Sequence, residues 1–114
     1  MKQRCMKSLK IANEIMSVLT HDKAYILESK LKFKRDETHF NFTLKPNRFS
    51  DQELKDFLEM LNLPRQSEME EYYWSLLGEN KSDDNILVVA RMIDEATAHV
   101  EDDTLSIHIV RKNA

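Results

Sequence analysis

Four histidines are the side chains of this sequence with most chemistry to offer near neutral pH: His21, His39, His99 and His108. No two of them stand four residues apart, so the helical spacing that lets a histidine pair bind zinc is missing. His39 and His108 fall at outward positions of two expected strands. If these strands are neighbours, the two rings can meet, and a shared metal ion or a pH-sensing role becomes possible. The simpler interpretation is two solvated imidazoles.

The remaining candidates for chemistry are isolated. His99 precedes Glu101, Asp102 and Asp103, which we interpret as an acidic connector between a helix and a strand, with an oxygen-rich metal loop as the weaker alternative. Cys5, the only cysteine, falls on the apolar side of an expected helix, so we predict a buried and unreactive thiol. A lone cysteine forms no internal disulfide, which suits a reducing compartment and makes a cytoplasmic location our expectation.

Several classes of enzyme site need motifs that the sequence lacks. Gly78 is the only glycine, whereas a P-loop and a dinucleotide fingerprint each need several. A nucleophile elbow of the G-x-S-x-G type is missing for the same reason. Without a second cysteine, a closed thiolate zinc site is excluded. The sequence therefore indicates no catalytic residue, cofactor or metal, and a small enzyme without a recognisable motif is only an alternative.

Hydrophobic periodicity predicts the elements that must position these side chains. Apolar residues recur every three or four positions over residues 3–20, as in an amphipathic helix. Elsewhere apolar and polar residues alternate, as in strands with one buried face. This alternation covers residues 24–34, 38–45 and 104–111.

Three further helices are expected between the second and third of these strands. Ser50 and Glu53 form a capping box at the start of the first helix, and Ser67 opens a second one in the same way. An apolar stripe over residues 86–100 predicts the third helix, although its first five residues alone also fit a buried strand.

The predicted order is therefore α-β-β-α-α-α-β, in a single domain over residues 1–114. Each strand has one apolar face that needs a cover. We therefore expect a two-layer α+β sandwich, in which a three-stranded antiparallel sheet is covered on one face by about four helices. A loop over residues 35–38 places Phe33 opposite Phe40 in the hairpin, and the last strand can join either edge. The longest apolar run, residues 86–90, is too short to cross a bilayer, and we expect no membrane contact.

The outer face of the predicted sheet is rich in basic side chains. Lys30, Lys32 and Lys34 share it with His39 and His108, and such a face can meet nucleic acid. Sheets that bind RNA stack bases on outward aromatic rings, however, and the phenylalanines of these strands point inward. The simpler interpretation is that the lysines discourage aggregation.

An aromatic cluster marks the helix expected after Ser67. Tyr72, Tyr73 and Trp74 are consecutive, and three consecutive helical positions span about 200° of the circumference. They cannot all face one core. Trp74 therefore either anchors an interface or packs against a neighbouring helix.

These observations favour a small interaction or regulatory protein that binds another protein, with a second copy of itself as the expected partner. Residues 1–50 carry eleven Lys and Arg against five Asp and Glu, whereas residues 51–114 carry six against fifteen. Such a split favours contact with another charged surface, and a three-stranded sheet leaves edges to be paired. Contact with nucleic acid through the basic first helix and hairpin is the alternative. The candidate interaction surface comprises Lys30, Lys32, Lys34, His39, Trp74 and His108.

Overall fold

The computed structural model describes residues 2–66, 68 and 85–113, and it shows an α+β fold. In the described part of the chain, three helices and four strands follow one another in the order α-β-β-α-α-β-β. The helices are α1 (Lys2–Leu19), α2 (Asp51–Leu61) and α4 (Asn85–Ala90). The strands are β1 (Ile26–Phe33), β2 (Glu37–Lys45), β3 (Glu95–Glu101) and β4 (Thr104–Lys112).

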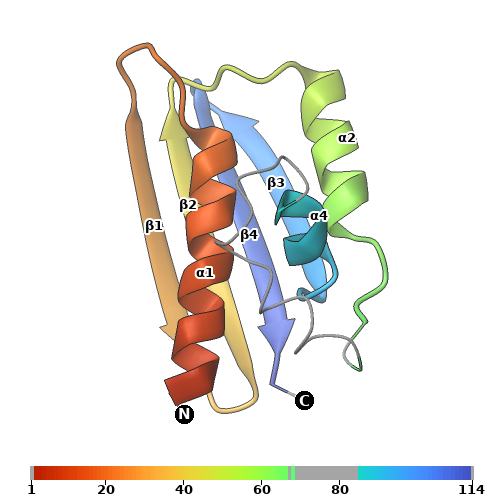
Figure 1. Ribbon diagram of the computed structural model, residues 1–114. Helices are drawn as coiled ribbons and strands as arrows, with labels where there is room; N and C mark the ends of the chain where they lie inside the picture. The colour runs from red at the N-terminus through yellow and green to blue at the C-terminus, as the bar shows by residue number, and fades with distance from the viewer. Residues whose placement is uncertain (1, 67, 69–84, 114) are drawn as a thin grey trace.

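The four strands form one antiparallel sheet in the order β1-β2-β4-β3. The described helices all lie on the same face of this sheet, and no described helix covers the other, open face (Figure 1). The last strand joins the hairpin at β2, which leaves β1 and β3 as the two edges. The prediction of an antiparallel sheet with its helices on one face is therefore confirmed for the described residues, whereas the predicted number of three strands is wrong.

The additional strand, β3, lies where the sequence predicted one long helix over residues 86–100. The helix α4 ends at Ala90, and β3 begins at Glu95. The alternation of small or apolar residues with polar ones from Glu95 to Glu101 is a strand pattern, but Ala96 and Val100 also fit the spacing of the helical stripe. Pairing with β4 decides between the two periods, so the helical interpretation of residues 95–101 is wrong. The helix predicted after Ser67 lies outside the described residues.

The core lies between the sheet and its helices. Every second residue of β2 and β4 is buried, as expected for strands with one covered face. These inward residues pack against one flank of α1 and the apolar side chains of α2 and α4. The fully buried large side chains include Phe40, Phe42, Leu44, Leu105, Ile107, Ile109, Ile11, Ile15, Leu19, Leu61, Met92 and Ile93.

The buried flank of α1 differs from the predicted one. Cys5 is exposed, and Leu9 is 59% exposed. The helix turns toward the sheet Ser8, Ile11 and Ile15, which also belong to the predicted stripe at three- and four-residue spacing, so only part of that stripe is buried. The prediction of a buried thiol is therefore wrong.

The first hairpin is tighter than predicted. Lys34 N donates to Glu37 O at 2.9 Å, so a two-residue turn joins β1 and β2. Leu31 consequently lies opposite Phe40, where the sequence predicted Phe33. The predicted register is thus wrong by two residues, which keeps every side chain on its predicted face because the strand period is also two.

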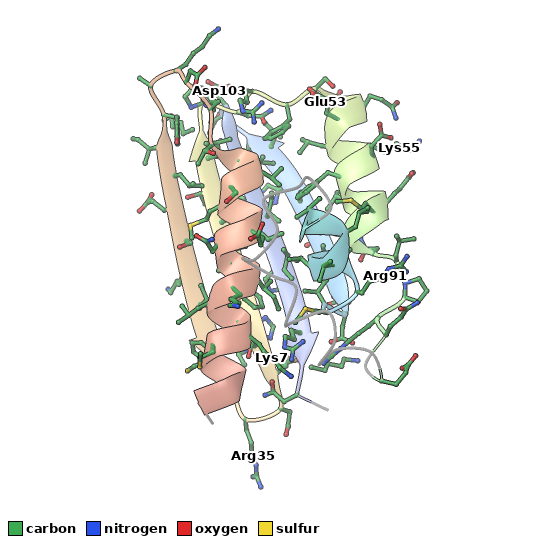
Figure 2. The ribbon with its side chains drawn as sticks, viewed as in Figure 1. Lys7, Arg35, Glu53, Lys55, Arg91 and Asp103 are labelled. Carbon is green, nitrogen blue, oxygen red and sulfur yellow. The ribbon has the colours of Figure 1, made fainter. Side chains whose placement is uncertain are left out.

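The second hairpin replaces the predicted connector between a helix and a strand. Glu101 pairs with Thr104, and the two aspartates between them, Asp102 and Asp103, have φ values of 50° and 63°. Positive φ at both central positions is the signature of a type I′ turn, a conformation that aspartate tolerates better than most residues. Asp103 marks this turn at one end of the sheet, and Arg35 marks the first hairpin at the other end (Figure 2).

The capping box at the start of α2 is confirmed. Ser50 Oγ accepts a hydrogen bond from Glu53 N at 3.1 Å, and Glu53 Oε1 accepts one from Ser50 N at 2.9 Å. The hydrogen bond from the Ser50 backbone, reinforced by the Ser50 hydroxyl, lowers the pKa of the Glu53 carboxyl.

No helix in the described part of the chain is both long and apolar enough to span a membrane.

Candidate functional site

The open sheet face carries five of the six predicted candidate residues. Strand pairing places Lys32 beside His39, and it aligns Lys30 with Asn41 and then with His108. Lys34 follows at the hairpin turn, directly after β1. The sixth candidate, Trp74, lies outside the described residues.

His39 and His108 meet at the centre of this face. Because β2 and β4 are neighbours, His39 Nδ1 lies 2.8 Å from His108 Nε2, and the two rings stack with centroids 5.0 Å apart. The other nitrogen of His39, Nε2, lies 2.7 Å from Glu37 Oε1. The prediction that the rings meet if their strands are neighbours is confirmed. The sequence did not single out Glu37.

The three side chains form a hydrogen-bonded chain, in which either histidine can carry the proton that lies between the two rings. A carboxylate only accepts, so His39 donates to Glu37 through Nε2. A single proton then lies between His39 Nδ1 and His108 Nε2, because two facing N–H groups would repel each other at this distance. The hydrogen bond from His39 lowers the pKa of Glu37 below its ordinary value, and the positive charges nearby lower it further.

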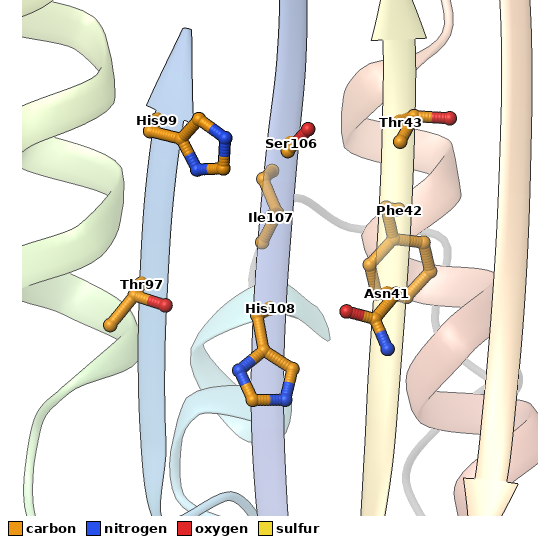
Figure 3. A pocket seen from close by; sticks show the side chains of 8 residues that line it. All are labelled: Asn41, Phe42, Thr43, Thr97, His99, Ser106, Ile107 and His108. Atoms are coloured by element: carbon orange, nitrogen blue, oxygen red, sulfur yellow. The ribbon is translucent and has the colours of Figure 1, made fainter.

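A shallow hollow of about 270 Å³ lies beside the histidine pair on the same face. Its walls include His108 and Ser106 from β4, Thr97 and His99 from β3, and Asn41 from β2 (Figure 3). Thr97 and His99 were not expected on this face, because residues 86–100 were predicted to form a helix. The period-two alternation from Glu95 to Glu101 is the signal that identifies them.

The edge strand β1 leaves backbone groups open to a further strand. In an antiparallel ladder, every second residue of a strand forms backbone hydrogen bonds with its neighbour. Because Lys34 N bonds to Glu37 O, the residues of β1 that bond to β2 in this way are Lys32, Lys30 and Glu28. The N–H and C=O groups of the intervening residues therefore point away from the sheet, and no other described residue bonds to them. These residues are Leu27, Ser29, Leu31 and Phe33.

The opposite edge, β3, is capped by a side chain. Asn62, at the end of α2, donates through Nδ2 to Ala96 O and accepts from Ala96 N, both at 2.9 Å. Its Nδ2 also donates to Leu58 O at 2.8 Å, which holds the amide in place. A side chain thus occupies the position where another strand would bond, so the two edges of the sheet are not equivalent.

Charge on the open face is divided between the two edges. Lysines outnumber Glu28 on β1, whereas β3 presents Glu95 and Glu101. Among the described outward positions of the four strands, histidine is the only ring-bearing residue. The face thus offers lysines but no Phe, Tyr or Trp for base stacking, and nucleic-acid contact stays a prediction.

No protein-family model matches the sequence, and no curated protein matches it either.

Proposed function

We propose that the protein is an interaction protein that works as a homodimer, assembled by antiparallel pairing of the β1 strands of two copies. The observation that carries the proposal is the self-complementary sequence of β1 around Ser29. A two-fold axis through Ser29 places each residue of one strand opposite the residue equally far on the other side of Ser29 in the second copy.

This register pairs opposite charges on the open face. Glu28 of each copy lies opposite Lys30 of the other, which gives two oppositely charged pairs. In this register they occupy positions that do not share hydrogen bonds, where side chains of neighbouring strands lie closest. Farther out, Ile26, which is 61% exposed, lies opposite Lys32, whose aliphatic stem can cover it.

The same register pairs apolar side chains on the helix side of the sheet. Leu27 of each copy lies opposite Leu31 of the other, and both are only half-buried in one copy. Phe33, 44% exposed, lies opposite Tyr25, which directly precedes the strand. The outward backbone groups of Leu27, Ser29 and Leu31 then bond to those of the second copy, so the pairing satisfies both the backbone and the side chains.

The resulting dimer has one continuous sheet with four strands from each copy. Because the two-fold axis is perpendicular to the sheet, the helices of both copies lie on the same side. The two open faces, each with its histidine pair, join into one wide polar surface on the other side. We propose that this joined surface binds a further protein, and that a regulatory role depends on this second interaction.

A charge swap tests the register. Each pair of opposite charges contributes about 0.2–1 kcal/mol and a like-charged pair costs about as much, so replacing two attractive pairs by two repulsive ones costs about 0.8–4 kcal/mol, or roughly a 4- to 900-fold weaker dimer. We expect both Glu28→Lys and Lys30→Glu to weaken the dimer in sedimentation equilibrium. The double variant restores opposite charges and is expected to recover the wild-type dissociation constant.

Mixing the two single variants is the sharpest control. One variant then carries two lysines at these positions and the other two glutamates, so they are expected to form a mixed dimer while each alone is weakened. A strictly monomeric wild-type protein at high concentration would overturn the proposal. So would a double variant as weak as the single ones, because that result excludes pairing of Glu28 with Lys30.

A further inference from the structure

We propose that His39 and His108 form a binding site for a divalent transition-metal ion of the Zn²⁺, Ni²⁺ or Cu²⁺ type. The two ligand atoms are His39 Nδ1 and His108 Nε2, which face each other at 2.8 Å across β2 and β4. Imidazole nitrogen is a preferred ligand of these ions, whereas Mg²⁺ and Ca²⁺ prefer oxygen. The histidine pair is independent of the β1 edge, so this site does not rest on the dimer.

The distance between the two nitrogens is close to what a shared ion needs. Two bonds of about 2.0–2.1 Å that meet at a tetrahedral angle hold their nitrogens about 3.3 Å apart. Opening the present contact by about half an ångström therefore admits the ion. The ion takes the place of the proton that the two nitrogens share in its absence.

Glu37 gives His39 the support that metal-binding histidines commonly have. A histidine that binds a metal usually donates its other ring N–H to a carboxylate or a carbonyl, which fixes its tautomer and orients the ring. His39 Nε2 lies 2.7 Å from Glu37 Oε1, so its free nitrogen, Nδ1, is directed at His108. The His39 side chain is only 16% exposed, which restricts the movement of the ring.

The coordination sphere is open on the side of the solvent. Within the described residues, no group of three or more His, Cys, Asp and Glu side chains is arranged to hold a metal ion. Two histidines therefore supply the protein ligands, and water or a small exogenous ligand completes the sphere. The hollow beside His108, with Asn41 and Thr97 on its walls, gives such a ligand room (Figure 3).

Titration of the full-length protein with Zn²⁺ alone, measured by isothermal titration calorimetry, tests the site. We expect one ion per chain and a loss of binding in His39→Ala and in His108→Ala. Glu37→Gln keeps both ligands and is expected to weaken binding by about 10- to 100-fold. His21→Ala is the matched control, because His21 lies between α1 and β1 and on no strand of the open face, and it is expected to bind like the wild type.

A nuclear magnetic resonance measurement on the wild-type protein keeps the proposal testable if a variant fails to fold. Long-range ¹H–¹⁵N spectra are expected to show zinc on Nδ1 of His39 and Nε2 of His108, with the proton on His39 Nε2 retained. Zinc binding that survives both alanine substitutions would overturn the proposal. So would unchanged imidazole ¹⁵N shifts of His39 and His108 in the presence of Zn²⁺.

Discussion

Replacing Asn62 by alanine is expected to destabilise the protein by uncovering the β3 edge. The substitution removes the two hydrogen bonds to Ala96 and the one to Leu58 O. Each such bond contributes about 1 kcal/mol net, and water can reach part of this edge, so we expect a loss of about 2–3 kcal/mol. Asn62→Asp keeps an acceptor for Ala96 N but loses the donor, and we expect it to be no more stable than the alanine variant.

Urea unfolding measures this loss, and it is done at one fixed protein concentration because the proposed dimerisation would make apparent stability depend on concentration. Hydrogen exchange is expected to show faster exchange at the Ala96 amide. Gln52→Ala is the matched control on α2: its side chain is exposed and, in the described part of the chain, bonds only to exposed Asp56, so the change should stay within about 0.5 kcal/mol. A loss below that value for Asn62→Ala, with an unchanged Ala96 amide, would refute the idea that this side chain caps the edge.

Three further substitutions test other parts of the fold. Arg4→Ala removes bonds of 3.3 Å to the hydroxyl of buried Thr38 and is expected to lower stability by about 1–3 kcal/mol in urea unfolding. The hydrogen bond from Ser50 lowers the pKa of Glu53, so this bond stabilises the fold fully at pH values above the ordinary glutamate pKa. The stabilisation is lost as the pH falls through the lowered pKa of Glu53. Glu53→Gln should therefore be less stable than the wild type near neutral pH, and equally stable in acid by circular dichroism. Asp103→Gly relieves a positive φ and is expected to gain about 0.5–1 kcal/mol, seen as a higher Tm.

Local patterns predicted the central part of the fold well. The alternation in β2 and β4 is unambiguous because both strands are covered by helices on one face and open on the other. The capping box of Ser50 and Glu53 is a local motif, and it forms as expected. These elements depend on their own residues more than on distant ones.

Elements whose structure depends on distant residues were harder to predict. The residues from Glu95 to Glu101 fit both a helical and a strand period, and only pairing with β4 decides between them. Exposure of Cys5 likewise depends on how α1 turns over the sheet, which the helix alone does not determine.

The candidate site likewise combines features that the local sequence predicts with features that depend on distant residues. The sequence predicted that His39 and His108 can meet, but the contact requires β4 to pair with β2. Glu37 was missed because it falls at the start of its strand, where alternation gives no reason to prefer it. The self-complementary pattern of β1 can be read from the sequence alone. It can pair two copies only if β1 is an edge of the sheet, and the strand order decides that.

A cysteine at the proposed two-fold axis tests the dimer most directly. In a Cys5→Ser background, Ser29→Cys places two thiols opposite each other in the hydrogen-bonded pair, where Cα atoms lie about 5.5 Å apart and a disulfide can form. We expect mild oxidation to link this variant into a dimer, while Ile26→Cys on the same strand, which lies opposite Lys32, forms no such link. Equal cross-linking of the two variants, or none at position 29, would contradict pairing of β1 around Ser29.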